Sequence, residues 1–143
     1  MTTNQIELVK KSWQLVAAID VQTVGSLFYN RLFEIAPEVK PMFSRTAADE
    51  QSKKLLTMLS YVISKLNNLG EIIGEVKKLA ERHVHYGVKD EHYTAVGRAL
   101  LWTLEKGLGS EWNDELKSAW TNCYTVLAEA MMEAANQTEI AVQ

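Results

Sequence analysis

Apolar residues recur every three or four positions along most of the chain, and no run alternates strictly between apolar and polar residues. This spacing marks one face of an α-helix, whereas a strand with one buried face has a period of two. We therefore predict an all-α fold with short connections. The expected helices carry, in order, Ile6, Val9, Trp13 and Val16; Val21, Val24, Phe28, Leu32 and Ile35; Leu55, Leu59, Val62 and Leu66; Ile72, Val76, Leu79 and His83; Val96, Leu100 and Leu104; and Leu116, Trp120, Tyr124, Leu127 and Met131.

The expected helix ends depend on polar caps, prolines and glycines. Asp20 can cap the second helix with its carboxylate. Pro37 should end it, because the residue before a proline is pushed out of the helical region. We also expect a Thr3–Asn4 cap on the first helix, a polar loop at 44–50, an end of the third helix at 67–70 and a C-cap of the fourth helix at Gly87. The fifth helix should start near Asp90, and the last should run from about 113 to 136, before a frayed tail at 137–143.

Composition and charge narrow the class of protein. The 143 residues are 47% apolar, which suits one domain over residues 1–143 with a real core. The net charge of −3 argues against a nucleic-acid partner and against an anionic membrane surface. No apolar run reaches the roughly 18 residues of a membrane span, and the N-terminal stretch lacks the pattern of a secretory signal. We expect a cytoplasmic protein, present as a monomer or a weak dimer.

The candidate chemistry lies in one short stretch, which holds all three histidines of the chain: His83, His85 and His92. Two residues apart on a helix, His83 and His85 would lie about 200° around the axis from each other. A zinc site also needs three or four ligands, and no remaining histidine or cysteine completes one. The single cysteine, Cys123, is expected to be a small packed residue, with an intersubunit disulfide as the alternative.

Haem iron needs only one histidine, because the porphyrin supplies four nitrogens and a neutral imidazole makes the fifth bond. His83 shares a helix face with Val76 and Leu79, so its ring should point into the interior. From position alone, a hydrogen-bonded packing role for His83 remains the alternative.

Three segments resemble the globin family: LFYNRLFEIAPEVKPMF (27–43), LAERHVHYGV (79–88) and HYTAVGRALLWTL (92–104). Pro37 precedes Phe43 by six residues, and His83 follows Phe43 by forty. The likeness is to bacterial single-domain globins and to the globin domain of flavohaemoglobins, and it covers residues 5 to about 133. It implies a globin fold of six to eight helices packed around a pocket for haem b.

The resemblance assigns His83 as the proximal ligand of the haem iron. On that side, Leu79 and Val88 match apolar contacts, and Tyr93 matches a tyrosine near the proximal histidine. Phe43 matches the phenylalanine that lies flat against the haem.

On the distal side, Tyr29 and Gln51 match the polar residues that face the bound gas, and Leu55 matches the apolar residue over the iron. If the register of the preceding loop shifts by one, Ser52 takes the place of Gln51. Lys54 is the first candidate for holding a haem propionate, with Arg82, His85 and Lys89 as the others, and His92 is read as a residue at the start of a helix.

Two departures from the flavohaemoglobin pattern bear on function. Ala135 stands where a glutamate would hydrogen-bond the proximal histidine, and Glu133 lies on another helical face. This argues against strong electron donation through the imidazole. There is also no distal histidine, so an internal sixth ligand would have to be Tyr29, Gln51, Lys54 or Met58.

These assignments imply a haem protein that binds oxygen, CO and NO reversibly and holds oxygen tightly. Oxygen on ferrous haem bears partial negative charge, so each donor from Tyr29 or Gln51 adds about 1.5–3 kcal/mol, whereas nearly neutral CO gains little. The alternative is a nitric oxide dioxygenase served by a separate reductase, because the chain has no G-x-G-x-x-G motif and no room for a reductase domain. A gas sensor would need an output domain, which 143 residues do not provide.

Overall fold

The computed structural model describes the backbone of residues 1–43, 47–85 and 88–142, and the side chains of these ranges except 85 and 137–142. Within them the regular structure is entirely helical, which confirms the predicted all-α fold. The elements are α1 (Thr3–Ala17), α2 (Val21–Ile35), η1 (Pro37–Phe43), α3 (Ala48–Ser64), η2 (Leu66–Ile72), α4 (Ile73–His85), α5 (Asp90–Leu108), η3 (Gly109–Glu111) and α6 (Asp114–Val142), where η marks 3₁₀ helix.

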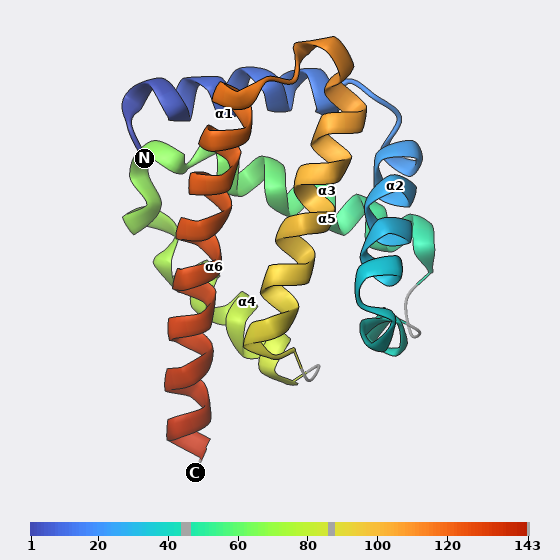
Figure 1. Cartoon of the computed structure of the whole chain (residues 1–143). Helices are drawn as coiled ribbons and strands as arrows, with labels where there is room; N and C mark the ends of the chain where they lie inside the picture. The colour runs from blue at the N-terminus through green and yellow to red at the C-terminus, as the bar shows by residue number, and fades with distance from the viewer. Residues whose placement is uncertain (44–46, 86–87, 143) are drawn as a thin grey trace.

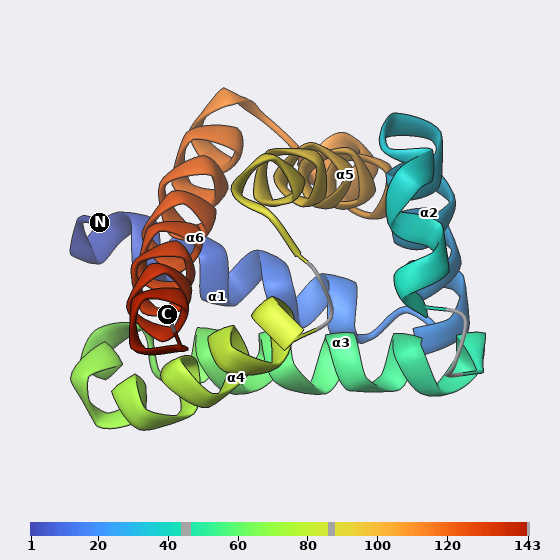
Figure 2. The same ribbon diagram turned by 90° about the horizontal axis from the view of Figure 1, so that it is seen from below.

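The helices enclose the centre of the molecule from several directions. In Figure 1, α5 and α6 run side by side, α1 lies across their upper ends, and α2 lies at the edge of the molecule away from α6. Seen from below in Figure 2, α3 and α4 lie along one side and α5 along the opposite side. Helix α2 packs against both α3 and α5, and α6 packs against α1, α4 and α5.

The buried apolar residues form two clusters rather than one. The larger cluster joins α1, α2, α3, α5 and α6, and Tyr29, Phe43 and Leu55 pack against it. The smaller cluster joins α4, α5 and α6, is centred on Ala80 and Tyr93, and takes in Leu79 and Val88 at its edge. The predicted distal and proximal residues therefore belong to different clusters.

Both predicted boundaries of the second helix are confirmed, whereas the predicted cap of the first helix is corrected. The Asp20 carboxylate accepts the Thr23 N–H at 3.1 Å, and α2 ends at Ile35, before Pro37. The first helix is capped by Thr2 rather than by the Thr3–Asn4 pair. The Thr2 hydroxyl accepts the Gln5 N–H and the Gln5 side chain accepts the Thr2 N–H, each at 3.1 Å, so two free donors are satisfied together.

The helices flanking the predicted loops differ in length from the prediction. Helix α3 starts at Ala48, so the last part of the expected loop at 44–50 is helical; Asp49 and Glu50 then lie in its first turn, where the helix dipole favours negative charge. It ends at Ser64, so Leu66 belongs to η2, which contains the non-helical Asn68 (φ −141°, ψ 54°). Helix α6 continues to Val142, beyond the predicted end near 136.

Other expectations concern single residues. Cys123 is buried with 1% of its surface exposed, as predicted, which leaves no sulfur accessible for an intersubunit disulfide. The predicted C-cap at Gly87 lies outside the described residues. No helix within the described residues is long and apolar enough to cross a membrane.

Candidate functional site

His83 lies in the last turns of α4, and its ring is held by the backbone of its own helix. Its Nδ1 atom lies 2.8 Å from the carbonyl oxygen of Leu79, one turn earlier. A carbonyl oxygen can only accept, so Nδ1 carries the proton and, in the neutral ring, Nε2 keeps its lone pair. Burial lowers the pKa of His83 below its ordinary value of 6.5, and the nearby Arg82 charge adds to this, whereas the bond to Leu79 opposes it. The imidazole therefore has the tautomer and the protonation state of an iron ligand.

Tyr93 lies beside His83, as predicted. The two rings are 6.4 Å apart between centroids and tilted by only 20°. Tyr93 is 8% exposed, and its hydroxyl is buried without a hydrogen-bond partner among the described residues. Its backbone carbonyl accepts the Tyr124 hydroxyl at 2.6 Å, which fixes α6 against the start of α5. Burial, followed by the charge of Asp90, raises the pKa of Tyr93.

The carboxylate that would accompany this tyrosine in the flavohaemoglobin pattern is absent here. Ala135 is buried at that part of α6, and Glu133 is exposed. The backbone carbonyl of Leu79 is instead the acceptor for the His83 Nδ1–H. A neutral carbonyl draws the Nδ1 proton less strongly than a carboxylate does, and weak electron donation through the imidazole stays a prediction.

Tyr29 belongs to the other cluster of the core, the one that does not include the proximal residues, and lies in an aromatic group formed by α2 and η1. Its ring centroid is 5.3 Å from that of Phe43 in an edge-on arrangement, 5.0 Å from Phe28 and 6.1 Å from Phe33. Its hydroxyl points to α3, where it lies 3.4 Å from the backbone oxygen of Gln51. Burial raises the pKa of Tyr29 to about 12, so the phenol keeps its proton at all physiological pH values.

Gln51 and Ser52 have different environments on α3. Ser52 is 3% exposed, its hydroxyl donates to the Ala48 carbonyl at 3.1 Å, and its side chain packs on Gly25 of α2. Gln51 is half-buried, and its carbonyl accepts the bond from Tyr29. The side chain of Ser52 is thus occupied by helix packing, and Gln51 is the residue beside the Tyr29 hydroxyl.

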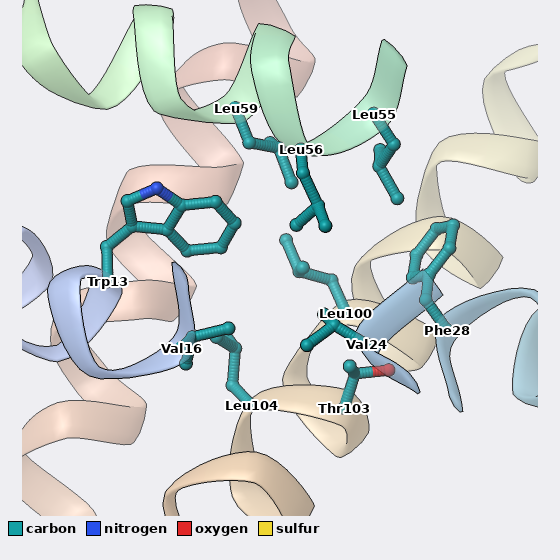
Figure 3. A pocket seen from close by; sticks show the side chains of 10 residues that line it. All are labelled: Trp13, Val16, Val24, Phe28, Leu55, Leu56, Leu59, Leu100, Thr103 and Leu104. Carbon is teal, nitrogen blue, oxygen red and sulfur yellow. The ribbon is translucent and has the colours of Figure 1, made fainter. Parts of the chain in front are cut away.

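Leu55 lies one turn beyond Gln51 and lines a small apolar cavity between α1, α2, α3 and α5 (Figure 3). The two polar side chains in its wall are satisfied elsewhere. The indole N–H of Trp13 donates to the Ser60 hydroxyl at 2.9 Å, and the Thr103 hydroxyl donates to the Ala99 carbonyl at 2.8 Å. Neither group is left to bind a water molecule, so the cavity is expected to contain none. Its full lining is Trp13, Val16, Val24, Phe28, Leu55, Leu56, Leu59, Leu100, Thr103 and Leu104.

The remaining predicted residues lie at the periphery. Lys54, Arg82 and Lys89 are exposed, Met58 is half-buried, and the His85 side chain lies outside the described residues. His92 is a residue at a helix start, as predicted: its Nδ1 accepts the backbone N–H of Lys89 at 3.0 Å.

These residues fit a haem. His83 offers a neutral imidazole nitrogen from α4, and Phe43 and Tyr29 offer aromatic surface from the other side.

Comparison with known proteins identifies the family. The sequence profile of the globin family matches residues 26–131. A protein of Physcomitrium patens named anaerobic nitrite reductase GLB0 is 35% identical over 137 residues, which is 86% of this chain and 76% of that protein. Leghemoglobin of Canavalia lineata is 34% identical over 139 residues, 91% of this chain and 93% of that protein. A bacterial globin from Campylobacter jejuni superposes with a TM-score of 0.83 at 28% identity, over 95% of this chain and 97% of that one.

The chain belongs to the globin family, whose members bind haem. The predicted family and the predicted fold are confirmed, and the structural likeness to a bacterial globin agrees with the resemblance that the sequence motifs indicated.

Two residues of the site were missed in the sequence. Gly25 was not singled out in the sequence, although a glycine one turn before Tyr29 within a helix is a signal for close helix packing. Tyr124 was predicted only as a core residue, although its hydroxyl fixes the backbone of Tyr93. The first could have been found from its position in the helical pattern, whereas the second depends on a contact 31 residues away along the chain.

Proposed function

We propose that this globin binds haem b through His83 and reversibly binds oxygen, CO and NO, with oxygen held tightly by Tyr29 and Gln51. The observation that supports this most directly is the placement of the Tyr29 hydroxyl beside Gln51, on the side of Phe43, while His83 approaches from α4. His83 would hold the haem, which would supply an iron that can bind the gas and change its oxidation state.

Tyr29 acts as a proton-bearing donor to the gas. Its present bond to the Gln51 carbonyl, at 3.4 Å, is long for an O–H···O bond and therefore weak. The hydroxyl can turn toward a more negative acceptor at little cost. The Gln51 amide adds a second donor, so the two bonds together would slow oxygen release by roughly 10²–10⁴.

Tight oxygen binding suits scavenging or chemistry on oxygen better than bulk delivery. One such reaction, the second candidate function, is nitric oxide dioxygenation, in which NO + O₂ + e⁻ gives NO₃⁻. The same donors favour it, because they hold oxygen long enough for NO to arrive. The electron must come from a separate reductase, which would be a partner of this protein.

The name of a relative, rather than the contacts of the site, indicates a further candidate reaction, which is a reduction. The relative from Physcomitrium patens carries the name anaerobic nitrite reductase. That reaction, NO₂⁻ + 2H⁺ + e⁻ → NO + H₂O, would take its electron from the same separate reductase and its protons from water, and it would use the protonated Tyr29 to hydrogen-bond a nitrite oxygen.

Absorption spectra of the purified protein test the central proposal. We expect one haem per chain on titration with hemin, a ferrous form that binds CO, and an oxygen complex that dissociates slowly in stopped-flow mixing. A protein that takes up no hemin would refute the proposal. Nitrate yield per haem after mixing the oxygenated protein with NO, and NO yield from nitrite without oxygen, separate the two enzymatic candidates from simple binding.

A further inference from the structure

Helices α2 and α3 cross at one very close contact, between Gly25 and Ser52. A Cβ atom added at Gly25 would overlap both Oγ and Cβ of Ser52 and would lie 3.2 Å from its Cα. Both residues are buried, and the Ser52 hydroxyl is bonded to Ala48. The backbone of Gly25 therefore lies directly against the short side chain of Ser52, and this contact sets the separation of the two helices. No flexible side chain lies between them that could move aside for an added atom.

This contact lies between two hydrogen bonds that also join the helices. Three residues before Gly25, the Gln22 amide donates to the Asp49 carbonyl at 3.3 Å. Four residues after it, the Tyr29 hydroxyl reaches the Gln51 carbonyl at 3.4 Å. Gln51 directly precedes Ser52, so each distal donor lies within about one helical turn of the crossing.

We propose that Gly25 and Ser52 are positioning residues that set the distance between Tyr29 and Gln51, and thereby the selectivity of this globin for oxygen over CO. The inference rests on the proposed function of the two donors. Protein interiors are packed densely enough to transmit a displacement of this kind. The Tyr29 hydroxyl lies 3.4 Å from the backbone carbonyl of Gln51, which is at the long end of the hydrogen-bond range, so a slight separation of the helices breaks this contact and moves Tyr29 away from the segment of α3 that carries the second donor.

The test is a substitution and its compensating partner. Gly25→Ala forces the helices apart, and we expect the oxygen dissociation rate to rise at least about fivefold, with CO dissociation changed less than about twofold. Adding Ser52→Gly removes both overlapping atoms, so the double variant should return the oxygen rate to near the wild-type value, although it will be less stable because glycine is unfavourable within a helix. If Gly25→Ala does not retain haem, Ser52→Thr adds a methyl group at the same crossing and is measured instead.

A structural measurement and a control separate positioning from general destabilisation. Nuclear Overhauser contacts between the Tyr29 ring and α3 in the CO-bound protein should weaken in Gly25→Ala and return in the double variant. Val9→Ala leaves a gap at a fully buried position of α1 that takes no part in the site, and it should lower the melting temperature without changing the ratio of oxygen to CO dissociation.

An unchanged ratio in Gly25→Ala, or a double variant that regains the Tyr29 contacts but not slow oxygen release, overturns the inference. Tyr29→Phe distinguishes this outcome from failure of the proposed function. If that variant releases oxygen quickly while Gly25→Ala does not, the donors act as proposed and only the positioning role is wrong.

Discussion

His83 and His92 use the same ring nitrogen in opposite ways. The Nδ1 atom of His83 donates to the Leu79 carbonyl at 2.8 Å, whereas the Nδ1 atom of His92 accepts the Lys89 N–H at 3.0 Å. The two bonds select opposite tautomers, so Nε2 has a lone pair in His83 and carries the proton in neutral His92. The backbone thus leaves His83 with the nitrogen lone pair that an iron ligand needs, whereas it uses His92 to cap the start of a helix.

We expect His83→Gly to lose stoichiometric haem binding, because the fifth iron bond disappears. Added imidazole should restore much of the haem absorption by occupying the space of the lost ring. The matched variant, His92→Ala, should keep its haem and lose about 0.5–2 kcal/mol of stability, since only a helix cap is removed. A hemin titration followed by absorption, with thermal melts, measures both variants; full haem retention in His83→Gly without imidazole would contradict the assignment.

Tyr29→Phe should accelerate oxygen dissociation at least tenfold and leave CO nearly unchanged. The reason is charge: a hydrogen bond to a partly anionic ligand is worth about 1.5–3 kcal/mol, and bound CO offers little charge to stabilise. Stopped-flow ligand displacement measures both gases, and Tyr61→Phe, at a 41% exposed tyrosine of α3, serves as the control. Equal acceleration of both gases would show that the phenol acts by bulk rather than by its proton.

The sequence predicted the fold well where the signal was periodic or local. Three- and four-residue spacing located the helices, and Asp20 and Pro37 fixed their own boundaries through short-range geometry. The cap at Thr2 was also available, because Thr2 and Gln5 have the spacing of a reciprocal capping pair, but the second threonine made the assignment ambiguous. Leu66 continued the apolar spacing into a 3₁₀ segment, which periodicity alone does not distinguish from an α-helix.

The contacts within the site could be predicted less well from the sequence. Spacing along the chain and family resemblance suggested His83, Phe43 and Tyr29, yet neither shows which carbonyl receives the His83 proton or where the Tyr29 hydroxyl points. The direction of the Tyr29 hydroxyl depends on how α2 and α3 cross at Gly25. It is a property of a pair of helices, and a single helical pattern contains no information about its partner.

Two glycines of α5 should respond in opposite directions to alanine. At Gly97 a new Cβ would lie 2.7 Å from Cε2 of Tyr124, so we expect a net loss of about 1–3 kcal/mol from overpacking. At Gly107 the nearest atom is Cδ1 of Ile19 at 3.5 Å, an ordinary contact, so the gain in helix propensity should stabilise the protein by up to about 1 kcal/mol. Urea unfolding of the two variants measures the difference, and a stabilised Gly97→Ala would show that the Tyr124 ring moves aside freely.

The thiol of Cys123 should be almost unreactive in the folded protein. Burial raises its pKa to about 12, so very little thiolate exists at neutral pH, and only 1% of the residue is exposed. We expect no reaction with a disulfide reagent over hours at pH 8 in the native state, and one equivalent per chain in denaturant. Fast labelling of the native protein would mean that the helices around Cys123 open readily.

Tyr29 should also contribute to the response of stability to alkaline pH. Its pKa is about 12 in the folded chain and 10.0 ordinarily, so the folded state holds the phenol proton more tightly than the unfolded state does. The resulting stabilisation is complete below pH 10 and declines as the pH rises from 10 toward 12, by about 1.4 kcal/mol at pH 11. Tyr29→Phe lacks this loss, so the stability difference between wild type and variant should shift by that amount in favour of the variant between pH 8 and pH 11. Urea unfolding at the two pH values measures it. Because the phenol stays protonated, oxygen release should be independent of pH from 7 to about 10; a rise in that range would place the ionisation of Tyr29 far lower and would remove the charge argument for its role.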